Sequence, residues 1–504
     1  MSENSESDAI LLAIDQGTSS SRAIAFSPDG TVLATEQQAF EQIYPASGWV
    51  EHDAEVIWAT VLSTTRSVLE RLRTQKRGPV TAIGLTNQRE TTVVWDRRTG
   101  VPLHNAIVWQ DRRTAEDCRK LADAGHESEV AEKTGLLLDP YFSATKLAWI
   151  LDRVSGAREL AKAGHIAFGT IDSFLIWRLT RGRLHVTDAT NASRTALFDI
   201  RTGRWDEGLC KLFNVPLSCL PEVRDSAGDF GTTEASVLGE ALPIRGVAGD
   251  QQAALIGQAC FAPGDLKSTY GTGAFMVLNT GPQLVRSANR LLSTIAYQLN
   301  GQITYALEGS ILSAGSTIQW LRDGLGLVSR APEVEALASS VPDTGGVYLV
   351  PAFTGLGAPY WDPDARGMLV GLTRASGRAE IARAGLDSVA YQTRDLLDAM
   401  AADQIRPASL KVDGGMAQNG LFLQRLADIL NLPILRPKMA ESTAFGAACL
   451  AGLGSGVYAS LNDVSSLWKP DARSEPRIDA ATRDRALAGW RDAVKRALTP
   501  QTRS

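Results

Sequence analysis

A pattern of strand, short Gly/Thr turn and strand occurs once in each half of the chain, and this repetition limits the possible folds more than any other feature. In the first half, an expected strand at 9–14 runs into Asp15-Gln-Gly-Thr18, and a second strand at 22–26 follows. In the second half, expected strands at 266–270 and 274–279 flank Gly271-Thr-Gly273. Such a turn lets the backbone approach a ligand and adds hydroxyl donors, as a nucleotide phosphate requires. One turn of this kind is typical of an ordinary hairpin, whereas two, one per half, favour a nucleotide clamp.

The repetition predicts two α/β domains. Asp29-Gly30 precedes a further expected strand at 31–35, and Asn300-Gly301 separates strands at 295–299 and 303–307; both dipeptides are hairpin signals. The chain has 504 residues, and one hydrophobic core rarely serves more than roughly 250 to 300. We therefore expect an acidic, disordered tail over 1–8, an N-terminal domain over 9–256 and a C-terminal domain over 257–504, each domain carrying one phosphate turn.

Periodicity supplies further elements. Asp53 is a plausible N-cap for a helix that continues to about Arg73, because apolar residues recur there at helical spacing. Strands are expected at 80–85 and 91–95, and the region from Glu380 onward is dominated by helices, with short strands at 410–412 and 433–435. The opening strands form a β-meander, so the pattern differs from the plain strand-helix alternation of a dinucleotide-binding fold.

Composition excludes several classes of protein. The net charge of −5 and the pI near 5.7 give no electrostatic reason to expect nucleic-acid binding. The most apolar stretches are shorter than the roughly 18 residues that a membrane span needs. The five cysteines contain no Cys-x-x-Cys pair and the five histidines lack metal-ligand spacing, so we expect a reduced, cytoplasmic protein without a zinc site.

Polar residues follow several expected strands, at places where α/β sheets put functional groups. Gly249-Asp-Gln-Gln252 stands at a strand-to-helix junction, and Asn87-Gln-Arg-Glu90 stands between two apolar strands. Gly414-Gly415 precedes a helix from about Gly420, as in a ligand site at a helix N-terminus. Asp15 is suited to hold Mg²⁺ through water, since Mg²⁺ usually takes only one or two carboxylates. Each motif alone is also typical of a cap or a polar loop, and no P-loop motif is present.

In order, these segments resemble the FGGY carbohydrate kinase family, and within it the branch that acts on glycerol. The resemblance runs over nearly the whole chain. It is carried by the segments 15–22, 40–45, 48–53, 86–92, 106–110, 139–142, 249–252, 270–273 and 351–361. The runs Asn87 to Thr92 and Pro351 to Trp361 separate this branch from the pentulose kinases of the same family.

The resemblance implies an α/β fold of two duplicated actin-like (ribonuclease H-like) ATPase domains around a central cleft, and ATP-dependent phosphorylation of glycerol to glycerol 3-phosphate with Mg²⁺. Asp250 would be the general base. The implied glycerol pocket consists of Arg89, Glu90, Tyr141, Asp250 and Gln251, with Trp109 and Phe275 against the carbon skeleton. The implied nucleotide contacts are Thr18, Ser19, Ser20, Arg22, Thr272, Gly315, Gln319, Gly415 and Asn419. A homo-oligomer, dimer or tetramer, is also expected.

The chain departs from the family pattern in two regulatory features. The loop over 237–245 lacks the Gly-Gly-Thr-Arg run with which some bacterial relatives bind fructose bisphosphate. No histidine follows His185, which leaves no candidate for the activating histidine phosphorylation of other relatives. Two other functions stay open: a kinase for a related triose or larger polyol, and a nucleotide-driven binding protein on the same type of fold.

Overall fold

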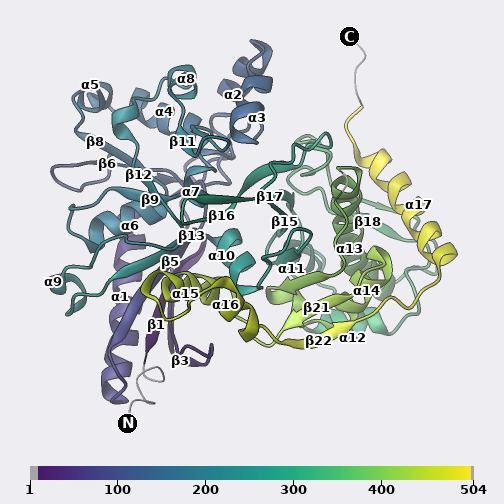
Figure 1. Ribbon diagram of the computed structural model, residues 1–504. Helices are drawn as coiled ribbons and strands as arrows, with labels where there is room; N and C mark the ends of the chain where they lie inside the picture. Colours follow the sequence, from purple (N-terminus) through teal and green to yellow (C-terminus); the bar gives the residue numbers. More distant parts are fainter. Residues whose placement is uncertain (1–8, 404, 501–504) are drawn as a thin grey trace.

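Two lobes, each built around a mixed β-sheet, make up the protein (Figure 1). The computed structural model describes residues 9–403 and 405–500. The expected tail over 1–8 lies outside the described residues.

The N-terminal sheet has the strand order β13-β5-β1-β2-β3. Strands β1, β2 and β3 form the expected antiparallel meander, while β5 and β13 run parallel to β1. Gly30 turns between β2 and β3 at φ +86°, a conformation that glycine adopts without strain. The strands are β1 (Ile10–Gln16), β2 (Ser20–Phe26), β3 (Val32–Ala39), β5 (Val80–Asn87) and β13 (Ile244–Gly249).

The C-terminal sheet repeats this topology and confirms the duplication. Its order is β16-β17-β15-β14-β20-β21-β22, and the run β17-β15-β14-β20-β21 has the strand directions of β3-β2-β1-β5-β13. Asn300 and Gly301 have φ of +52° and +72°, as expected for an Asn-Gly hairpin. The strands are β14 (Leu266–Tyr270), β15 (Ala274–Gly281), β16 (Leu292–Leu299), β17 (Gln302–Ile311), β20 (Leu410–Asp413), β21 (Ile434–Pro437) and β22 (Pro470–Ser474).

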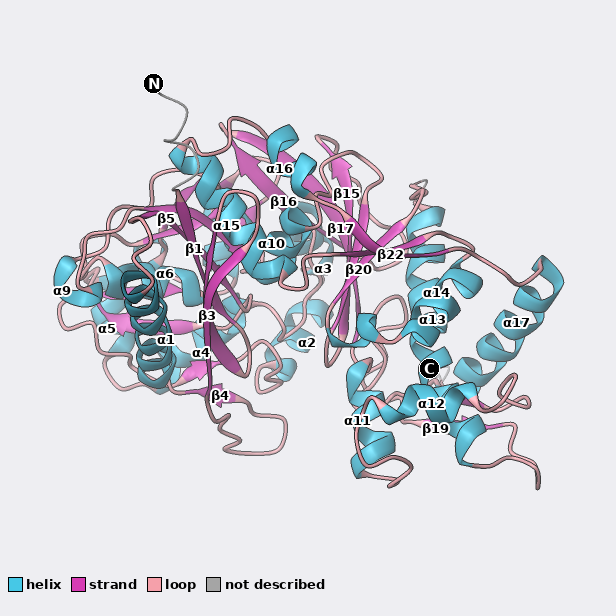
Figure 2. Ribbon diagram, turned by 90° about the horizontal axis from the view of Figure 1, so that it is seen from below, coloured by secondary structure: helices cyan, strands magenta, loops and turns pink. Residues whose placement is uncertain are grey.

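Helix α1 (Ala54–Thr74) covers one face of the N-terminal sheet (Figure 2). Its N-cap is Asp53, as expected: the side chain accepts hydrogen bonds from the backbone of Glu55 and Val56. The apolar face of α1, with Ile57 and Val61, packs against Leu12 and Ile14 of β1.

The opposite face of the same sheet is covered by a helix from the other end of the chain. Helix α15 (Ser442–Ser455) packs on β1, β5 and β13 and crosses α10 (Asp250–Gly257). Figure 1 shows the yellow-green α15 among the purple and blue strands of the N-terminal lobe. Leu11 and Ala13, which alternate with Leu12 and Ile14 along β1, face this helix pair. Because β1 is buried on both faces, its sequence is a continuous apolar run.

A helical insertion between β5 and β13 completes the N-terminal lobe. Its helices are α2 (Ala115–Asp123), α3 (Glu127–Thr134), α4 (Ser143–Arg153), α5 (Ala157–Lys162), α6 (Ile171–Leu179), α7 (Ala189–Ala192), α8 (Glu207–Leu212) and α9 (Ala235–Leu238), with a 3₁₀ turn at Leu217–Cys219. Short two-stranded sheets connect them: β4 (Glu51–His52) with β7 (Ala106–Ile107), β6 (Val93–Asp96) with β8 (Ile166–Gly169), β9 (Val186–Asp188) with β12 (Glu222–Arg224), and β10 (Phe198–Asp199) with β11 (Arg204–Trp205).

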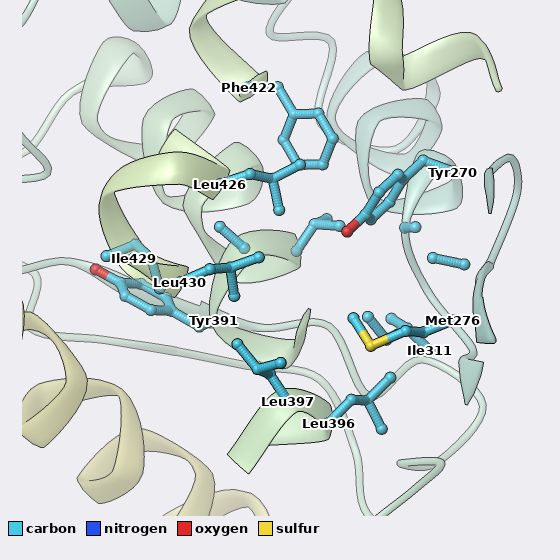
Figure 3. Packing of buried hydrophobic residues seen from close by; sticks show 14 of the residues in the cluster. Tyr270, Met276, Ile311, Tyr391, Leu396, Leu397, Phe422, Leu426, Ile429 and Leu430 are labelled. Atoms are coloured by element: carbon cyan, nitrogen blue, oxygen red, sulfur yellow. The ribbon is translucent and has the colours of Figure 1, made fainter. Parts of the chain in front are cut away.

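The core of the C-terminal lobe lies between its sheet and a set of helices. Tyr270, Met276 and Ile311 from the strands meet Leu396 and Phe422 from the helices (Figure 3). The remaining elements of this lobe are α11 (Gly315–Asp323), α12 (Glu333–Ser339), β18 (Tyr348–Val350), β19 (Met368–Val370), α13 (Arg378–Ala402), a 3₁₀ turn at Gly415–Gln418, α14 (Gly420–Leu430), α16 (Leu461–Leu467) and α17 (Ala480–Ala497).

The sequence predicts that the protein has no membrane span and that its cysteines form no Cys-x-x-Cys pair. Within residues 9–403 and 405–500, none of the helices is both long enough and apolar enough for a bilayer span. All five cysteines are buried and unpaired in this part of the chain.

Candidate active site

Two neighbouring parallel strands deliver the candidate catalytic residues to one edge of the N-terminal sheet. β5 and β13 end together, with Gly249 opposite Asn87. Arg89 and Glu90 follow β5, and Asp250 begins α10 immediately after β13. The N-cap of α10 is Gly249 rather than Asp250, so capping does not account for the carboxylate. Glu90 has φ +59°, a conformation uncommon outside glycine that recurs at functional sites.

Asp250 lies beside Arg89 with one carboxylate oxygen unsatisfied. Oδ1 is 3.3 Å from Nε of Arg89, but it is buried and makes no hydrogen bond within the described residues. Burial raises the pKa of this carboxyl, while the cations of Arg89 and Lys267 oppose the rise. The side chain as a whole is 28% exposed, against 2% for Arg89. A carboxylate oxygen that makes no hydrogen bond, on a side chain partly open to solvent, is available to accept a proton or a hydrogen bond from a hydroxyl group.

Three aromatic rings form a wall next to this carboxylate. The rings of Trp109 and Tyr141 are 5.7 Å apart and those of Trp109 and Phe275 are 5.9 Å apart, all edge to face. Phe275 also lies 5.8 Å from the guanidinium of Arg89. The expected pocket residues Arg89, Tyr141, Trp109 and Phe275 are therefore brought together, with Phe275 contributed by the other lobe.

The expected pocket also contains two residues that sequence reasoning missed. Glu308 on β17 binds Arg89 through two hydrogen bonds, of 2.5 Å and 2.9 Å. Arg194 donates to Oε1 of Glu90 at 2.6 Å and to Glu308 at 3.0 Å. Burial works to raise the pKa of Glu308, but Arg194 and Arg89 hold it at about 2. The signal in the sequence was a lone carboxylate inside the apolar run of β17, which is costly unless it is paired.

Gln251 points to a third missed residue, Lys267. The Nζ atom of Lys267, on β14, donates to Oε1 of Gln251 at 2.7 Å and to Oγ1 of Thr269 at 3.1 Å. Burial lowers the pKa of Lys267 to about 8, against the opposing effect of the carboxylates of Asp413 and Asp250. Gln251 thus links α10 to the strand that leads into the second phosphate turn.

The first Gly/Thr turn lies beside the aromatic wall. Oγ1 of Thr18 accepts a hydrogen bond of 3.0 Å from the indole of Trp109, and Gln88 donates to the carbonyl of Gly17. Ser19 is exposed, and the hydroxyl of Ser20 accepts from Gln37. Arg22 forms an ion pair with Glu441, at the start of α15, so this expected phosphate ligand already has a partner from the C-terminal half.

The second turn is surrounded by the other expected nucleotide residues. The amide of Gly315 donates to the carbonyl of Gly271, and that of Ser316 to Thr272, which places the start of α11 on the turn. A Cβ atom at Gly414 would lie 2.5 Å from the carbonyl of Tyr270, so only glycine permits this approach.

The remaining expected nucleotide residues differ in availability. Gly415 faces open space and Gln319 on α11 is exposed. The Oδ1 atom of Asn419 caps α14 by accepting from the amide of Phe422, which occupies that oxygen. The structure therefore gathers Thr272, Gly315 and Gly415 directly, whereas no hydrogen bond ties Gln319 to them within the described residues.

Asp15 is the penultimate residue of β1, next to the first turn, in register with Arg22 on β2 and Thr86 on β5. Burial raises its pKa to about 7; Arg22 opposes this, and Asp250 and Glu441 add to it. No group of three or more His, Cys, Asp or Glu side chains suited to a metal occurs in the described part of the chain. A single carboxylate of this kind fits Mg²⁺ held largely by water and phosphate oxygens.

Two duplicated α/β lobes, with two Gly/Thr turns and a polar pocket that contains the Asp250 carboxylate, are the arrangement expected of a kinase that acts on a small hydroxylated molecule. The chain belongs to the FGGY family of carbohydrate kinases: the N-terminal domain model of this family matches residues 10–257 and the C-terminal domain model matches 266–455.

Full-length relatives agree with this assignment. The chain is 60% identical over 486 residues to a glycerol kinase of Rhodospirillum centenum, covering 96% of this chain and 97% of the relative. It is 61% identical over 487 residues to a glycerol kinase of Alcanivorax borkumensis, with coverage of 96% and 98%. The crystal structure of Plasmodium falciparum glycerol kinase with ADP superposes with a TM-score of 0.92 at 37% identity, covering 98% of this chain and 99% of that one.

Proposed function

We propose that the protein catalyses ATP-dependent phosphorylation of glycerol to sn-glycerol 3-phosphate. The Asp250 carboxylate, paired with Arg89 but with its buried Oδ1 free of hydrogen bonds in the described residues, is the observation that carries this proposal. The names of the relatives at about 60% identity support glycerol as the acceptor.

In the proposed mechanism, Asp250 accepts the proton of a primary hydroxyl as its oxygen attacks the γ-phosphoryl group in line with the leaving ADP. Because the transition state is loose, proton removal comes late and the orientation of the hydroxyl matters more than the basicity of the carboxylate. Arg89, Glu90, Tyr141 and Gln251 orient the hydroxyl groups. Trp109 and Phe275 pack against the carbons.

The nucleotide lies between the two turns in this proposal. Thr18, Ser19, Ser20 and Arg22 bind phosphates from one lobe and Thr272 from the other, while Gly315, Gln319, Gly415 and Asn419 line the adenosine side. Asp15 would hold Mg²⁺ through water, and the ion would supply positive charge to the β- and γ-phosphates. Glu441 binds only Nη1 of Arg22, so the other donors of the guanidinium stay available to a phosphate.

Selectivity follows from the buried polar groups of the pocket. A substrate that lacks one hydroxyl leaves a charged or amide group unpaired, and this costs about 10⁴-fold where the stranded group is buried. A longer sugar instead collides with Trp109 and Phe275. The pocket therefore fits a short polyol.

The test is ADP release from the purified protein with ATP and Mg²⁺, with and without glycerol, beside dihydroxyacetone, glyceraldehyde, erythritol and xylulose. We expect a strong rate with glycerol alone. A preference for another acceptor would replace glycerol in the proposal, and an acceptor-independent ATPase would favour a nucleotide-driven binding protein.

Other parts of the proposal concern the whole chain. We propose domains over 9–256 and 257–504, a homo-oligomer, and a cytoplasmic location. The buried, unpaired cysteines support a reducing compartment. Light scattering coupled to gel filtration measures the oligomeric state.

A further inference from the structure

Four buried charges form a closed ring beneath the proposed acceptor pocket. Arg194 joins Glu90 to Glu308, Glu308 holds Arg89, and Nε of Arg89 returns to Glu90 at 3.9 Å. None of these four side chains is more than 2% exposed. Two positive and two negative charges cancel, which limits the cost of burying them.

Most of the N–H donors of Arg89 are engaged within the ring. Both Nη atoms bind Glu308 in a two-pronged arrangement, and Nη1 also donates to Gln252 at 3.3 Å. A guanidinium has five N–H groups in a fixed plane, so the contact with Glu308 determines the direction of the remaining N–H groups. Nε lies 3.3 Å from Oδ1 of Asp250 as an ion pair without a hydrogen bond, and Nη2 also donates to the hydroxyl of Tyr141 at 3.5 Å.

Glu308 comes from the opposite lobe. It lies on β17, opposite Val277 of β15, whereas Arg89, Glu90 and Arg194 belong to the N-terminal half. The plane of Arg89, and with it the donors next to Asp250, is therefore set by a carboxylate of the C-terminal sheet.

We propose that Glu308 is a positioning residue of the acceptor site: by binding both Nη atoms of Arg89 it aims the free donors of that arginine at Asp250 and at the acceptor hydroxyls, and it makes acceptor binding depend on the contact between the lobes. This inference rests on the proposed function for the identity of the acceptor. It assigns Glu308 no contact with substrate.

The experiment compares Glu308→Gln and Glu308→Asp with the wild type in steady-state kinetics, varying glycerol and ATP separately. Glutamine keeps the size of the side chain but removes one acceptor oxygen and the charge. We expect Glu308→Gln to raise the KM for glycerol at least tenfold and to lower kcat at least tenfold, with the KM for ATP within twofold. Glu308→Asp, which keeps a two-pronged acceptor, should recover part of the loss in glycerol KM.

Asp387→Asn is the matched control. Asp387 on α13 is buried and accepts two hydrogen bonds from Arg425, of 2.9 Å and 3.0 Å. It therefore forms the same kind of two-pronged carboxylate–arginine pair as Glu308, but away from the pocket. Its loss should lower thermal stability without changing the KM for glycerol. ADP binding, measured by calorimetry, reports the folded fraction of each variant.

The outcomes separate this inference from the proposed function. Suppose that the wild type phosphorylates glycerol and that the KM for glycerol in Glu308→Gln lies within twofold of the wild-type value. This result overturns the role of Glu308 and leaves the proposed function intact. Equal loss of glycerol and ATP affinity, or no recovery in Glu308→Asp, also overturns it. If the wild type prefers another polyol, the proposed acceptor is wrong, and a tenfold rise in the KM for that polyol still supports the inference. Turnover without any acceptor dependence contradicts both.

Discussion

Asp250, the proposed general base, has a free carboxylate oxygen at the edge of the pocket. Its Oδ1 atom is buried without a hydrogen bond in the described residues, and the side chain keeps some exposure at the pocket. Arg89 and Lys267 supply positive charge that limits the rise of its pKa caused by burial. The carboxylate therefore keeps one oxygen that is free to accept a hydroxyl proton in the proposed mechanism.

Replacing this carboxylate should remove turnover while leaving the nucleotide site intact. We expect Asp250→Asn to lower kcat by about 10³-fold, within the range for loss of a positioned general base. ATP affinity, measured by calorimetry, should change little because Thr272 and the other expected nucleotide residues are untouched. A kcat within tenfold of wild type would remove Asp250 from the role of base.

Lys267 supplies a pH-dependent charge beside the proposed phosphoryl-transfer site. Burial lowers its pKa to about 8, so in the free protein the ammonium is charged below this pH and neutral above it. The charge lies close to the carboxylates of Asp250 and Asp413. Losing it should weaken the binding of an anionic nucleotide.

We expect kcat/KM for ATP to fall as the pH rises through about 8, since this parameter reports the free enzyme. Lys267→Met should have a lower kcat/KM at pH 7 and should lack this alkaline limb. The control is Lys411→Met, on the adjacent strand β20, because Lys411 binds the carbonyls of Gln258 and Ala259 instead. An unchanged alkaline limb in Lys267→Met would assign the titration to another group.

The same pKa shift predicts the sign of a stability effect. The unfolded chain keeps the lysine proton up to its ordinary pKa of about 10.4, whereas the folded protein releases it near pH 8. Between these values the unfolded state binds more protons, so this group makes the wild type more stable as the pH rises. The free energy of unfolding of the wild type, relative to that of Lys267→Met, should therefore rise between about pH 8 and 10, as measured by urea unfolding.

Helices α10 and α15 approach each other more closely than side chains normally permit. A Cβ atom at Gly446 would lie 1.8 Å from the carbonyl of Ala253, and one at Gly257 would lie 1.9 Å from that of Ser442. These obstacles are backbone atoms, which cannot rotate away. Glycine is therefore required at this crossing for close packing and not for an unusual φ.

We expect Gly446→Ala to destabilise the protein by about 3 kcal/mol, at the upper end for overpacking, and to lower kcat because α10 begins with Asp250. The control is Gly208→Ala in α8, where the added Cβ would meet the ends of side chains, those of Asp206 and Lys133 at 3.0 Å and that of Glu129 at 3.9 Å. That variant should stay within about 1 kcal/mol of wild type, since alanine also favours a helix. Equal urea midpoints for the two variants would contradict the close crossing.

At the scale of the whole molecule, the two halves of the sequence do not correspond to two independent packing units. Leu11, Ile24 and Phe26 of the N-terminal sheet share a core with Ala447 and Leu450 of α15. The ion pair between Arg22 and Glu441 and the contact between Arg89 and Glu308 also join the halves. An N-terminal fragment lacks the cover for one face of its sheet.

A fragment over residues 1–256 should therefore fail to fold cooperatively. Without α15, the apolar face of β1 and β2 is exposed, and we expect dye binding, aggregation and a broad urea transition. The full-length chain under the same conditions is the control. A sharp transition with a midpoint near that of the full-length chain would show that the N-terminal half needs no help from α15.

Much of the site was predictable because its residues follow strands. Asp15, Arg89 and Asp250 lie at the ends of parallel strands, whose carboxyl ends meet at one edge of the N-terminal sheet, and Thr272 lies in the Gly/Thr turn of the C-terminal sheet. Glu308, Arg194 and Lys267 were missed because each is a lone charge in a segment with no turn signal. Their partners are far away in the sequence.

The sequence by itself determined the repeated strand topology, the N-cap of α1, the two phosphate-type turns and the family, since all of these depend on local periodicity and short motifs. Only the tertiary structure decided that α15 covers the N-terminal sheet and that Glu308 holds Arg89. Periodicity reports which face of an element is apolar, but the choice of the partner that buries it depends on long-range packing. Likewise, a lone charged residue in an apolar segment indicates that the side chain needs an oppositely charged partner. Only the folded structure shows which residue that partner is.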